Sequence, residues 1–156
     1  RNSPTLLNIA WYDWVTWAGK HDSLSMQGAN APEAGTDVAT SRLFMAHVLY
    51  RKYRDEYVAV FGVPLDPALD PMHPEAARFP PAGKPKAMGA EDGPWEKMAP
   101  ADRDHVMTIM ANVGKAIEAF ERKLESRNSP FERYVKGEHA ALTDRQKNGL
   151  RLFIGK

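Results

Sequence analysis

The side chains that could carry chemistry in this sequence are aromatic and carboxylic rather than nucleophilic. Three of the four tryptophans, Trp11, Trp14 and Trp17, lie within seven residues at a spacing of three. The five histidines are His21, His47, His73, His105 and His139. They are too scattered to show the spacing of metal ligands. The sequence has no cysteine, no H-E-x-x-H motif and no serine–histidine–aspartate order. Without a cofactor these residues have no evident reaction, as expected where a bound group carries the chemistry.

The tryptophans belong to the stretch 1–24, on which the rest of the chain depends. Ser3 followed by Pro4 is a helix-start signal, because serine caps a helix and proline suits its first position. Apolar residues follow for one or two turns, namely Leu6, Leu7, Ile9 and Ala10. Because indole rings bury a large area, periodicity alone predicts that the tryptophans anchor the core.

Length and composition favour a small helical protein. The chain has 156 residues, enough for one domain or one and a fraction. Its 21 basic and 20 acidic residues leave no basic excess that would indicate nucleic acid or an anionic membrane as a partner. No apolar run approaches the roughly 18 residues of a membrane span, and the start has no signal-like segment. Helix formers dominate, so the predicted class is all-α with long loops.

The sequence of the first half of the chain predicts two helices separated by a loop. Asp22 or Ser23 can cap a short helix, and the small residues of 28–35 then predict a loop. Thr36 or Asp37 is predicted to start a longer helix that ends at Gly62, with a kink near Arg51. Its histidine, His47, is predicted to pack rather than to bind a metal.

The second half begins with a proline-rich excursion. Eight prolines between Pro64 and Pro94 exclude regular helix or strand over 63–98, which is ordered if Phe79 and Trp95 pack. The longest helix is predicted over 100–126, and it should pack against the helix that begins near Thr36, with the tryptophans at their edge. Its apolar stripe is Val106, Ile109 or Met110, Val113, Ile117, Phe120 and Leu124. Gly114 interrupts this helix, which indicates close approach of a neighbour. His105, in the first turn, is predicted to face solvent.

Two short helices are predicted near the end of the chain. Each starts with a capping box, Ser129 with Glu132 and Thr143 with Gln146.

The amino-acid sequences at both ends of the chain resemble those of one protein family. The start reads RNSPTLLN, and Trp17 is followed by a glycine, a basic residue, the triplet DSL and Gln27. The end, ANVGKAIEAFERKLESRNSPFERYVKGEHAALTDRQKNGLRLFIGK, resembles the run before the second haem-attachment motif of the same family. The family is that of the bacterial di-haem cytochrome c peroxidases and the related MauG-like oxidases. The middle, about residues 62–98, matches weakly.

The sequence has no cysteine, so it contains no haem-attachment motif of the kind that this family carries. A c-type haem is attached through C-x-x-C-H, and the sequence has none. In the family one motif lies before RNSPT and another after GLRLF, so we expect the chain to be the piece between two haem motifs. The alternative is a natural haem-less relative. On this resemblance, residues 1–127 belong to the N-terminal, peroxidatic haem domain, and 128–156 begin the C-terminal, electron-transfer haem domain. A haem edge then becomes a second candidate for the neighbour of Gly114.

The resemblance also implies functional residues. Trp17 takes the place of the tryptophan that relays electrons between the haems, while Trp11 and Trp14 mainly pack. Asn2 takes the place of an asparagine that helps to bind calcium. Gln27, ten residues after Trp17, takes the place of a glutamine in the peroxide pocket. The axial histidines and haem cysteines of the family have no counterpart within the chain.

The catalytic acid of the family is a glutamate twenty residues after the tryptophan, and that count reaches Asp37. Splitting the O–O bond of peroxide needs a proton to move between its two oxygens, which a positioned carboxylate can do. Aspartate is one methylene shorter, about 1.5 Å in reach, so Glu33 is the alternative carboxylate. Asp37 could instead serve only as a helix N-cap. Ala18 and Lys20 depart from the family's aspartate and arginine.

The functions that follow from the resemblance are expectations. The first is a periplasmic oxidoreductase that reduces hydrogen peroxide to water with two haem c groups, with calcium as a possible further cofactor. Its electron donor would be a small cytochrome c or cupredoxin, and a homodimer is possible. The alternatives are a MauG-like oxidase and a haem-less helical interaction module.

Overall fold

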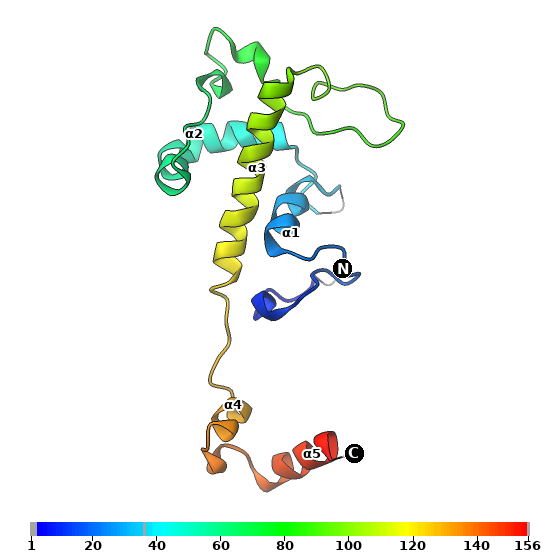
Figure 1. The fold of residues 1–156 in the computed structure, drawn as a ribbon, viewed down its shortest axis with the longest axis vertical. Helices are drawn as coiled ribbons and strands as arrows, with labels where there is room; N and C mark the ends of the chain where they lie inside the picture. Colours follow the sequence, from blue (N-terminus) through cyan, green and yellow to red (C-terminus); the bar gives the residue numbers. More distant parts are fainter. Residues whose placement is uncertain (1–2, 36, 156) are drawn as a thin grey trace.

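The computed structural model describes residues 3–35 and 37–155 and confirms the all-α class (Figure 1). Within these residues the only β-type pairing is a single bridge between Val15 and His21. The α-helices are α1 (Leu24–Asn30), α2 (Arg42–Phe61), α3 (Pro100–Glu121), α4 (Pro130–Val135) and α5 (Asp144–Ile154). The 3₁₀ turns are η1 (Ile9–Trp11), η2 (Ala31–Glu33), η3 (Pro67–Leu69), η4 (Ala76–Arg78) and η5 (His139–Ala141).

Helix α3 is the central element, with α1 along its side and α2 across its upper half (Figure 1). Pro100 occupies its first turn and Asp102 complements the helix dipole there. It ends at Glu121, five residues before the predicted end at 126. The packing of this helix against α2 confirms that predicted contact.

Two glycines allow α1 and α3 to approach closely. A Cβ built on Gly114 would clash with the carbonyl oxygen of Ser25 and lie 3.2 Å from the Cβ of Ala29. A Cβ on Gly28 would lie 3.0 Å from the Cγ2 of Ile117. The predicted close neighbour of Gly114 is therefore confirmed, and it is α1.

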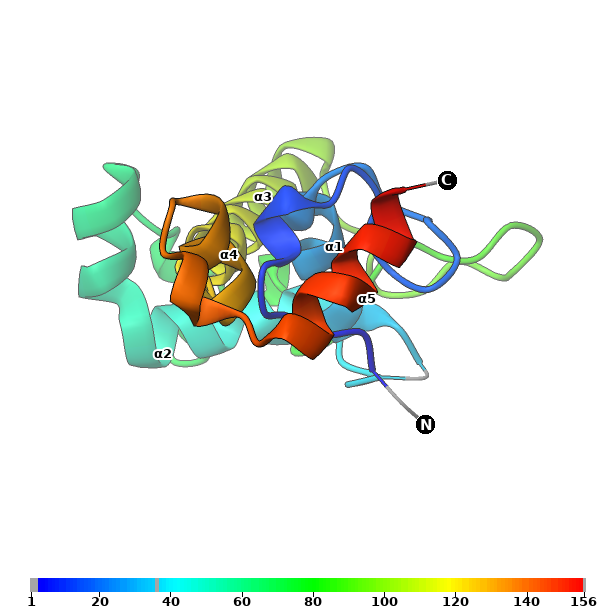
Figure 2. The ribbon, with the colours of Figure 1, turned by 90° about the horizontal axis from the view of Figure 1, so that it is seen from below.

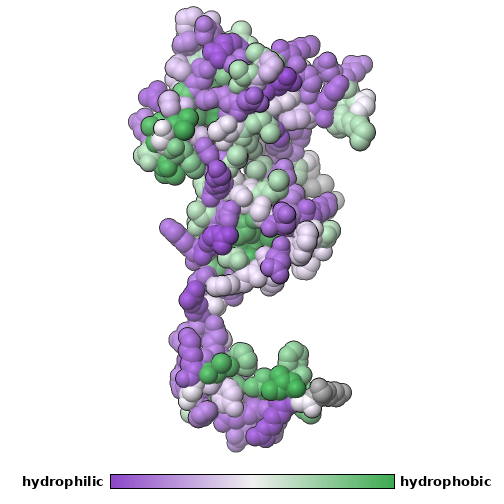
Figure 3. Space-filling view, in the orientation of Figure 1, coloured by the Kyte–Doolittle hydropathy of each residue, from purple (hydrophilic) through white to green (hydrophobic). Residues whose placement is uncertain are grey.

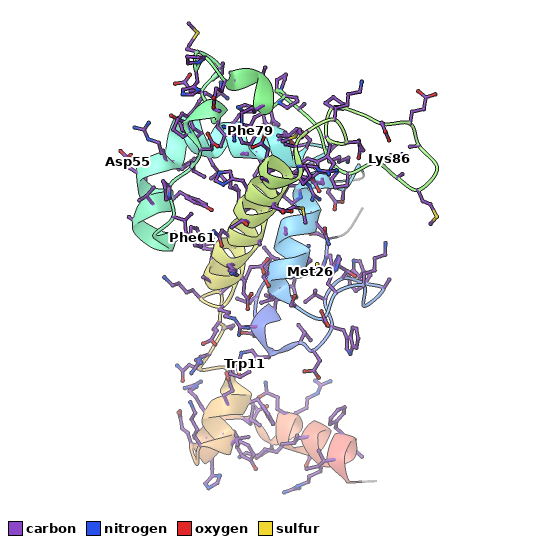
Figure 4. The ribbon with its side chains drawn as sticks, turned by 45° about the horizontal axis from the view of Figure 1, so that its top comes forward. Trp11, Met26, Asp55, Phe61, Phe79 and Lys86 are labelled. Carbon is purple, nitrogen blue, oxygen red and sulfur yellow. The ribbon has the colours of Figure 1, made fainter. Side chains whose placement is uncertain are left out.

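The main core lies between α2, the upper half of α3 and the proline-rich stretch. The proline-rich stretch was predicted to be ordered if Phe79 and Trp95 pack, and both side chains are buried. Figure 4 places Phe79 at the upper end of α3. The largest cluster also contains Leu43, Ala46, Tyr57, Leu65, Ala68, Leu69, Met98, Val106 and Ile109.

Polar contacts hold the proline-rich stretch to the helices. The Nδ1 of His47 lies 2.8 Å from the carbonyl oxygen of Leu69, and Nε2 lies 3.2 Å from that of Phe79 and 3.1 Å from that of Pro80. His47 is thus a packed residue, as predicted. Arg78 bridges this stretch to α3 through Asp102.

His105 differs from its prediction. Its Nε2 accepts a hydrogen bond from the backbone N–H of Asp66 at 3.2 Å, so it packs on the loop instead of facing solvent.

The N-terminal stretch differs most from expectation. It forms no α-helix after Pro4, only the 3₁₀ turn η1, and Asn8 precedes that turn with a φ of 61°. Trp11, Trp14 and Trp17 are 70%, 65% and 77% exposed, so the prediction that they anchor the core is wrong. Their spacing of three suits a helix face, but the backbone here turns repeatedly, so the rings gain no helical neighbour to pack against.

The region between α1 and α2 also needs correction. Residues 28–30 continue α1 and 31–33 form η2, so the loop predicted over 28–35 is shorter. Helix α2 begins at Arg42, because Ser41 caps it by accepting a hydrogen bond from the N–H of Phe44. Its kink lies at Tyr53, two residues after the predicted one, and Gly62 ends it with a φ of 68°.

Helices α4 and α5 lie below the rest of the chain, beyond an extended stretch that follows α3 (Figures 1 and 2). Both predicted capping boxes are present, at Ser129 and at Thr143. Figure 3 shows apolar surface on this lower part, where Phe131, Phe153 and Ile154 are exposed. The domain boundary near 127 stays a prediction.

None of the described helices has the combination of length and hydropathy that crossing a bilayer requires.

Candidate functional site

A cleft of about 630 Å³ lies between the N-terminal segment, α1, the loop after η2 and the lower end of α3. Its walls are largely apolar, from Ile9, Val15, Leu24, Ala31 and Ala34. Its polar lining includes Trp17, Lys20, His21, Gln27, Asn30, Asp37 and Glu121. The cleft therefore offers a few polar groups on a mostly apolar surface, which is typical of a cofactor or small-molecule site.

The cleft brings together three residues that the sequence analysis singled out. Trp17, Gln27 and Asp37 come from three different local structures, yet all line this one cavity. Ten residues separate each from the next, so only the fold around α1 brings them together.

A tight turn holds Trp17 at the cleft. The bridge between Val15 and His21 closes it, with the N–H of Val15 donating to the carbonyl oxygen of His21 at 2.9 Å. Gly19, with a φ of 59°, completes the reversal. The indole is largely exposed and also lines the cleft, so it connects the cavity with the outer surface.

Gln27 is held by the helix that carries it. Ser23 caps α1, accepting a hydrogen bond from the N–H of Met26 at 3.3 Å. Gly28, the next residue, sets the close packing of α1 on α3. The position of the Gln27 side chain thus depends on a helix fixed by two glycines.

Asp37 lies in the irregular loop before α2. Its N–H donates to the carbonyl oxygen of Ala34 at 3.0 Å, and the N–H of Thr40 donates to that of Pro32 at 2.9 Å. Because Ser41 is the N-cap of α2, the interpretation of Asp37 as a helix N-cap is wrong. Its role as an acid stays a prediction.

Glu33, the alternative carboxylate, has a structural partner. Its Oε1 accepts from the backbone N–H of Arg42 at 2.8 Å and from the Nε of Arg42 at 2.9 Å. The Arg42 guanidinium also stacks over the ring of Trp95, 5.2 Å from its centroid. Glu33 is absent from the residues that line the cleft. This ion pair closes the loop that carries Asp37.

Glu121 is a cleft residue that the sequence analysis missed. It is the last residue of α3 and is only 4% exposed, and its Oε2 has no hydrogen-bond partner among the described residues. Burial, and then the nearby charge of Glu118, raise the pKa of the Glu121 carboxyl.

A signal for Glu121 exists in the sequence. The apolar stripe of α3 reaches Ile117, and the next core position is either three or four residues on. Three residues lead to Phe120, the predicted choice, which is 60% exposed. Four residues lead to Glu121, so a charged residue at a core position was the available clue.

The histidines and the predicted calcium ligand contribute little to this site. His21 lines the cleft, while His73 and His139 make local contacts with Glu75 and Tyr134. Within 3–35 and 37–155 no cluster of three or more His, Cys, Asp or Glu side chains could hold a metal ion. Asn2, the calcium residue implied by resemblance, lies outside the described residues.

The cleft fits a haem by three observations. Its volume and apolar walls suit a flat macrocycle, its polar groups are few, and the orphaned Glu121 Oε2 calls for a polar group from a bound ligand. The cleft thus has the size and lining of a cofactor or small-molecule site on a helical scaffold.

The family follows from comparison of sequences. A family model described as "Di-haem cytochrome c peroxidase" matches residues 1–140. The chain belongs to this family.

Curated relatives agree with the family model. The chain is 30% identical over 162 residues to "Cytochrome-c peroxidase IdrP1" of Pseudomonas sp. (strain SCT), covering all of this chain and 31% of the relative. It is 28% identical over 158 residues to the protein of the same name in Denitromonas iodatirespirans, again covering all of this chain and 31% of the relative. It is 27% identical over 154 residues to the "Cytochrome c551 peroxidase" of Pseudomonas aeruginosa, covering 99% of this chain and 34% of the relative. The chain thus spans about a third of the length of these relatives. No solved structure matches it.

Proposed function

We propose that this chain is the inter-haem part of a di-haem c-type peroxidase that reduces hydrogen peroxide to water. The observation that carries the proposal is the single cleft shared by Trp17, Gln27 and Asp37. By resemblance to the family, these three residues would lie at the peroxide site and at the electron relay, and membership of the family supports the proposal.

The residues of this chain would hold the haem and its substrate. The apolar wall, with Ile9, Val15 and Leu24, would contact the macrocycle and exclude water from it. When bound, the haem supplies the electron transfer that peroxide reduction requires. The chain itself then has to orient the peroxide, move a proton and accept electrons.

Gln27 and Asp37 divide the first two tasks. The amide of Gln27 can both donate and accept a hydrogen bond, so it would orient the peroxide. The Asp37 carboxylate would take the proton from one peroxide oxygen and return it to the other, which then leaves as water. The loop that carries Asp37, which is not part of a helix, would have to make up for the shorter reach of aspartate.

Trp17 would take the third task. Its ring lines the cleft while most of it faces outward, as a relay between the cleft and a second redox centre requires. The second haem domain, beginning near 128, would carry that centre. A small cytochrome c or cupredoxin would be the electron donor, and the protein would act in the periplasm, with a calcium ion near Asn2.

A MauG-like oxidase and a haem-less interaction module are the alternatives. The printed names of the relatives, all cytochrome c peroxidases, favour the peroxidase over the oxidase. The cofactor-sized cleft favours both enzymes over the module.

The first test is an absorption spectrum of the full-length protein, followed by peroxide turnover with a reduced small cytochrome. We expect two haems and peroxide-dependent oxidation of the donor. A full-length protein without haem supports the interaction module. Two haems with no peroxide turnover support the oxidase.

The second test separates the two carboxylates. Asp37→Asn should lower turnover by on the order of a hundredfold or more, because general acid–base groups contribute at that scale. Glu33→Gln should lower it less, since Glu33 pairs with Arg42 outside the cleft. If Glu33→Gln abolishes turnover while Asp37→Asn keeps it, the acid is Glu33. If neither matters, the acid lies elsewhere in the protein.

A further inference from the structure

Burying a carboxyl group without a hydrogen-bond partner costs free energy. Among the described residues, Glu121 has a buried carboxyl oxygen, Oε2, without such a partner. It closes the lower end of α3, where the helix meets the N-terminal segment, and it is 4% exposed. Its Oε2 contacts no donor or acceptor of the described chain. Because the residue lines the cleft, a group bound in the cleft is in position to supply the missing partner.

The surroundings of Glu121 raise the pKa of its carboxyl, first through burial. Glu118, one turn earlier on α3, adds a negative charge beside it. The other titratable groups around the cleft are Lys20, His21 and Asp37, from the N-terminal segment and from the loop before α2. None of these is a hydrogen-bond partner of Oε2. When protonated, the carboxyl carries an O–H donor, whose natural partner is an acceptor such as a second carboxylate.

The chemistry of the acceptor follows from the occupant. We propose that the O–H of Glu121 donates a hydrogen bond to a carboxylate of the group bound in the cleft, which on the proposed function is a haem propionate. A hydrogen bond to an ionised acceptor is roughly twice as strong as a neutral one, so it offsets the burial of the acid. A second carboxylate nearby also disfavours ionisation of Glu121, so the two groups share one proton and one charge. Glu121 is thereby a positioning residue for the haem.

The arrangement explains why a glutamate ends α3. The i, i+4 step from Ile117 places this side chain on the face that packs toward α1 and the cleft. Glu118, by contrast, is tied to Arg122 on the surface, with 2.7 Å between its Oε1 and the Arg122 Nη2. The two glutamates form a matched pair, one facing the cleft and one at the surface, and they provide the control.

The test uses the full-length, haem-loaded protein, in which haem content is measured first. Infrared spectra at neutral pH should show the carbonyl stretch of a protonated carboxyl, which lies at higher frequency than that of a carboxylate. Glu121→Gln should lose this band. Glu118→Gln should keep it, because burial is a larger cause of the raised Glu121 pKa than the Glu118 charge. Resonance Raman spectra should show a shift of the propionate bending mode in Glu121→Leu, a smaller shift in Glu121→Gln, whose amide can still donate, and none in Glu118→Gln.

Three results overturn the proposal. They are a wild-type protein without the protonated band, a band that persists in Glu121→Gln, and propionate modes that stay unchanged in Glu121→Leu. If the leucine variant does not fold, the nearly isosteric glutamine variant and the wild-type band still decide. A full-length protein without haem refutes the proposed function, and this inference with it. A haem-loaded protein with any of the three results refutes this inference alone.

Discussion

Two glutamates one helical turn apart show how burial decides the behaviour of a residue. The pKa of Glu118 is lowered, first by its hydrogen bond with Arg122, and a hydrogen bond with Ser25 of α1 adds to the effect. The pKa of Glu121 is raised, first by burial. The same side chain on the same helix is thus a surface anion at one position and a buried acid at the other.

This contrast predicts opposite pH effects. A raised folded-state pKa means that the native state holds its proton more tightly, so the contribution of Glu121 is present at low pH and lost as pH rises through that pKa. Glu121→Gln, which cannot ionise, should therefore gain stability over the wild type as pH rises from 4 to 8. Glu118→Gln should lose stability over the same range, since the Glu118 carboxylate is stabilised by its partners. Thermal melting at several pH values checks both, and parallel curves for all three proteins would contradict the assignment.

His47 is the second residue with a testable structural role. Its ring nitrogens lie within hydrogen-bond distance of three carbonyl oxygens, those of Leu69, Phe79 and Pro80. His47→Leu should lower the free energy of unfolding by about 1–3 kcal/mol, because partly buried carbonyl oxygens lose the N–H of the ring. His73→Leu is the control, with an expected change within about 0.5 kcal/mol, since the hydrogen bond found for its ring among the described residues is an exposed one, from the N–H of Glu75. Equal losses from chemical denaturation of the two variants would count against the role of His47.

At the scale of elements, the packing of α1 on α3 sets the geometry of the cleft. Gly114→Ala should lower the free energy of unfolding by about 1–3 kcal/mol, because its methyl group clashes with the backbone at Ser25. Gly149→Ala, within α5 and with open space around it, should instead raise helix stability by about 0.5–1 kcal/mol. Denaturation curves of both variants test the contrast. An unchanged stability in Gly114→Ala would show that α1 can shift, and Gln27 with it.

Elements with local signals were predictable from the sequence. The capping boxes at Ser129 and Thr143, the cap at Ser23 and the stop at Gly62 each depend on contacts within a few residues, and each is present. For the proline-rich stretch, the sequence predicted only that it is ordered if Phe79 and Trp95 are packed. Whether they are packed depends on partners in distant helices.

The parts that failed depend on contacts far along the chain. The signal at Ser3 and Pro4 is local, but the segment after it follows the end of α3 instead of forming a helix, since Asn8 bonds to residues 124 and 126. For the site, counting from Trp17 reached Gln27 and Asp37, which do line one cleft. The step of four from Ile117 reaches Glu121, but the step of three to Phe120 fits the apolar pattern better, and only the N-terminal segment folding over the end of α3 decides which of the two is buried.

At the scale of the whole molecule, Asn8 links the N-terminal segment to the stretch that leads from α3 to α4. Its N–H donates to the carbonyl oxygen of Leu124 at 2.8 Å, and its Oδ1 accepts from the N–H of Ser126 at 2.7 Å. The φ of 61° at Asn8 is a left-handed conformation that asparagine tolerates better than most residues. This residue therefore fixes where the chain leaves the body around α3, and with it the direction toward α4 and α5 (Figure 1).

Replacing Asn8 by glycine tests this link without adding backbone strain, because glycine adopts a positive φ freely. Asn8→Gly removes only the side-chain bond to Ser126, so the amide of Ser126 should exchange faster with solvent, by roughly fivefold or more for a bond of about 1 kcal/mol. Trypsin should also cleave after Arg127 more readily. Asn128→Gly is the matched control, since Asn128 has a φ of 71° and makes no comparable bond among those found in the described residues. It should leave exchange at Ser126 unchanged. If Asn8→Gly leaves both the exchange and the cleavage at wild-type rates, the path from α3 to α4 is held by other contacts, and Asn8 only shapes its own turn.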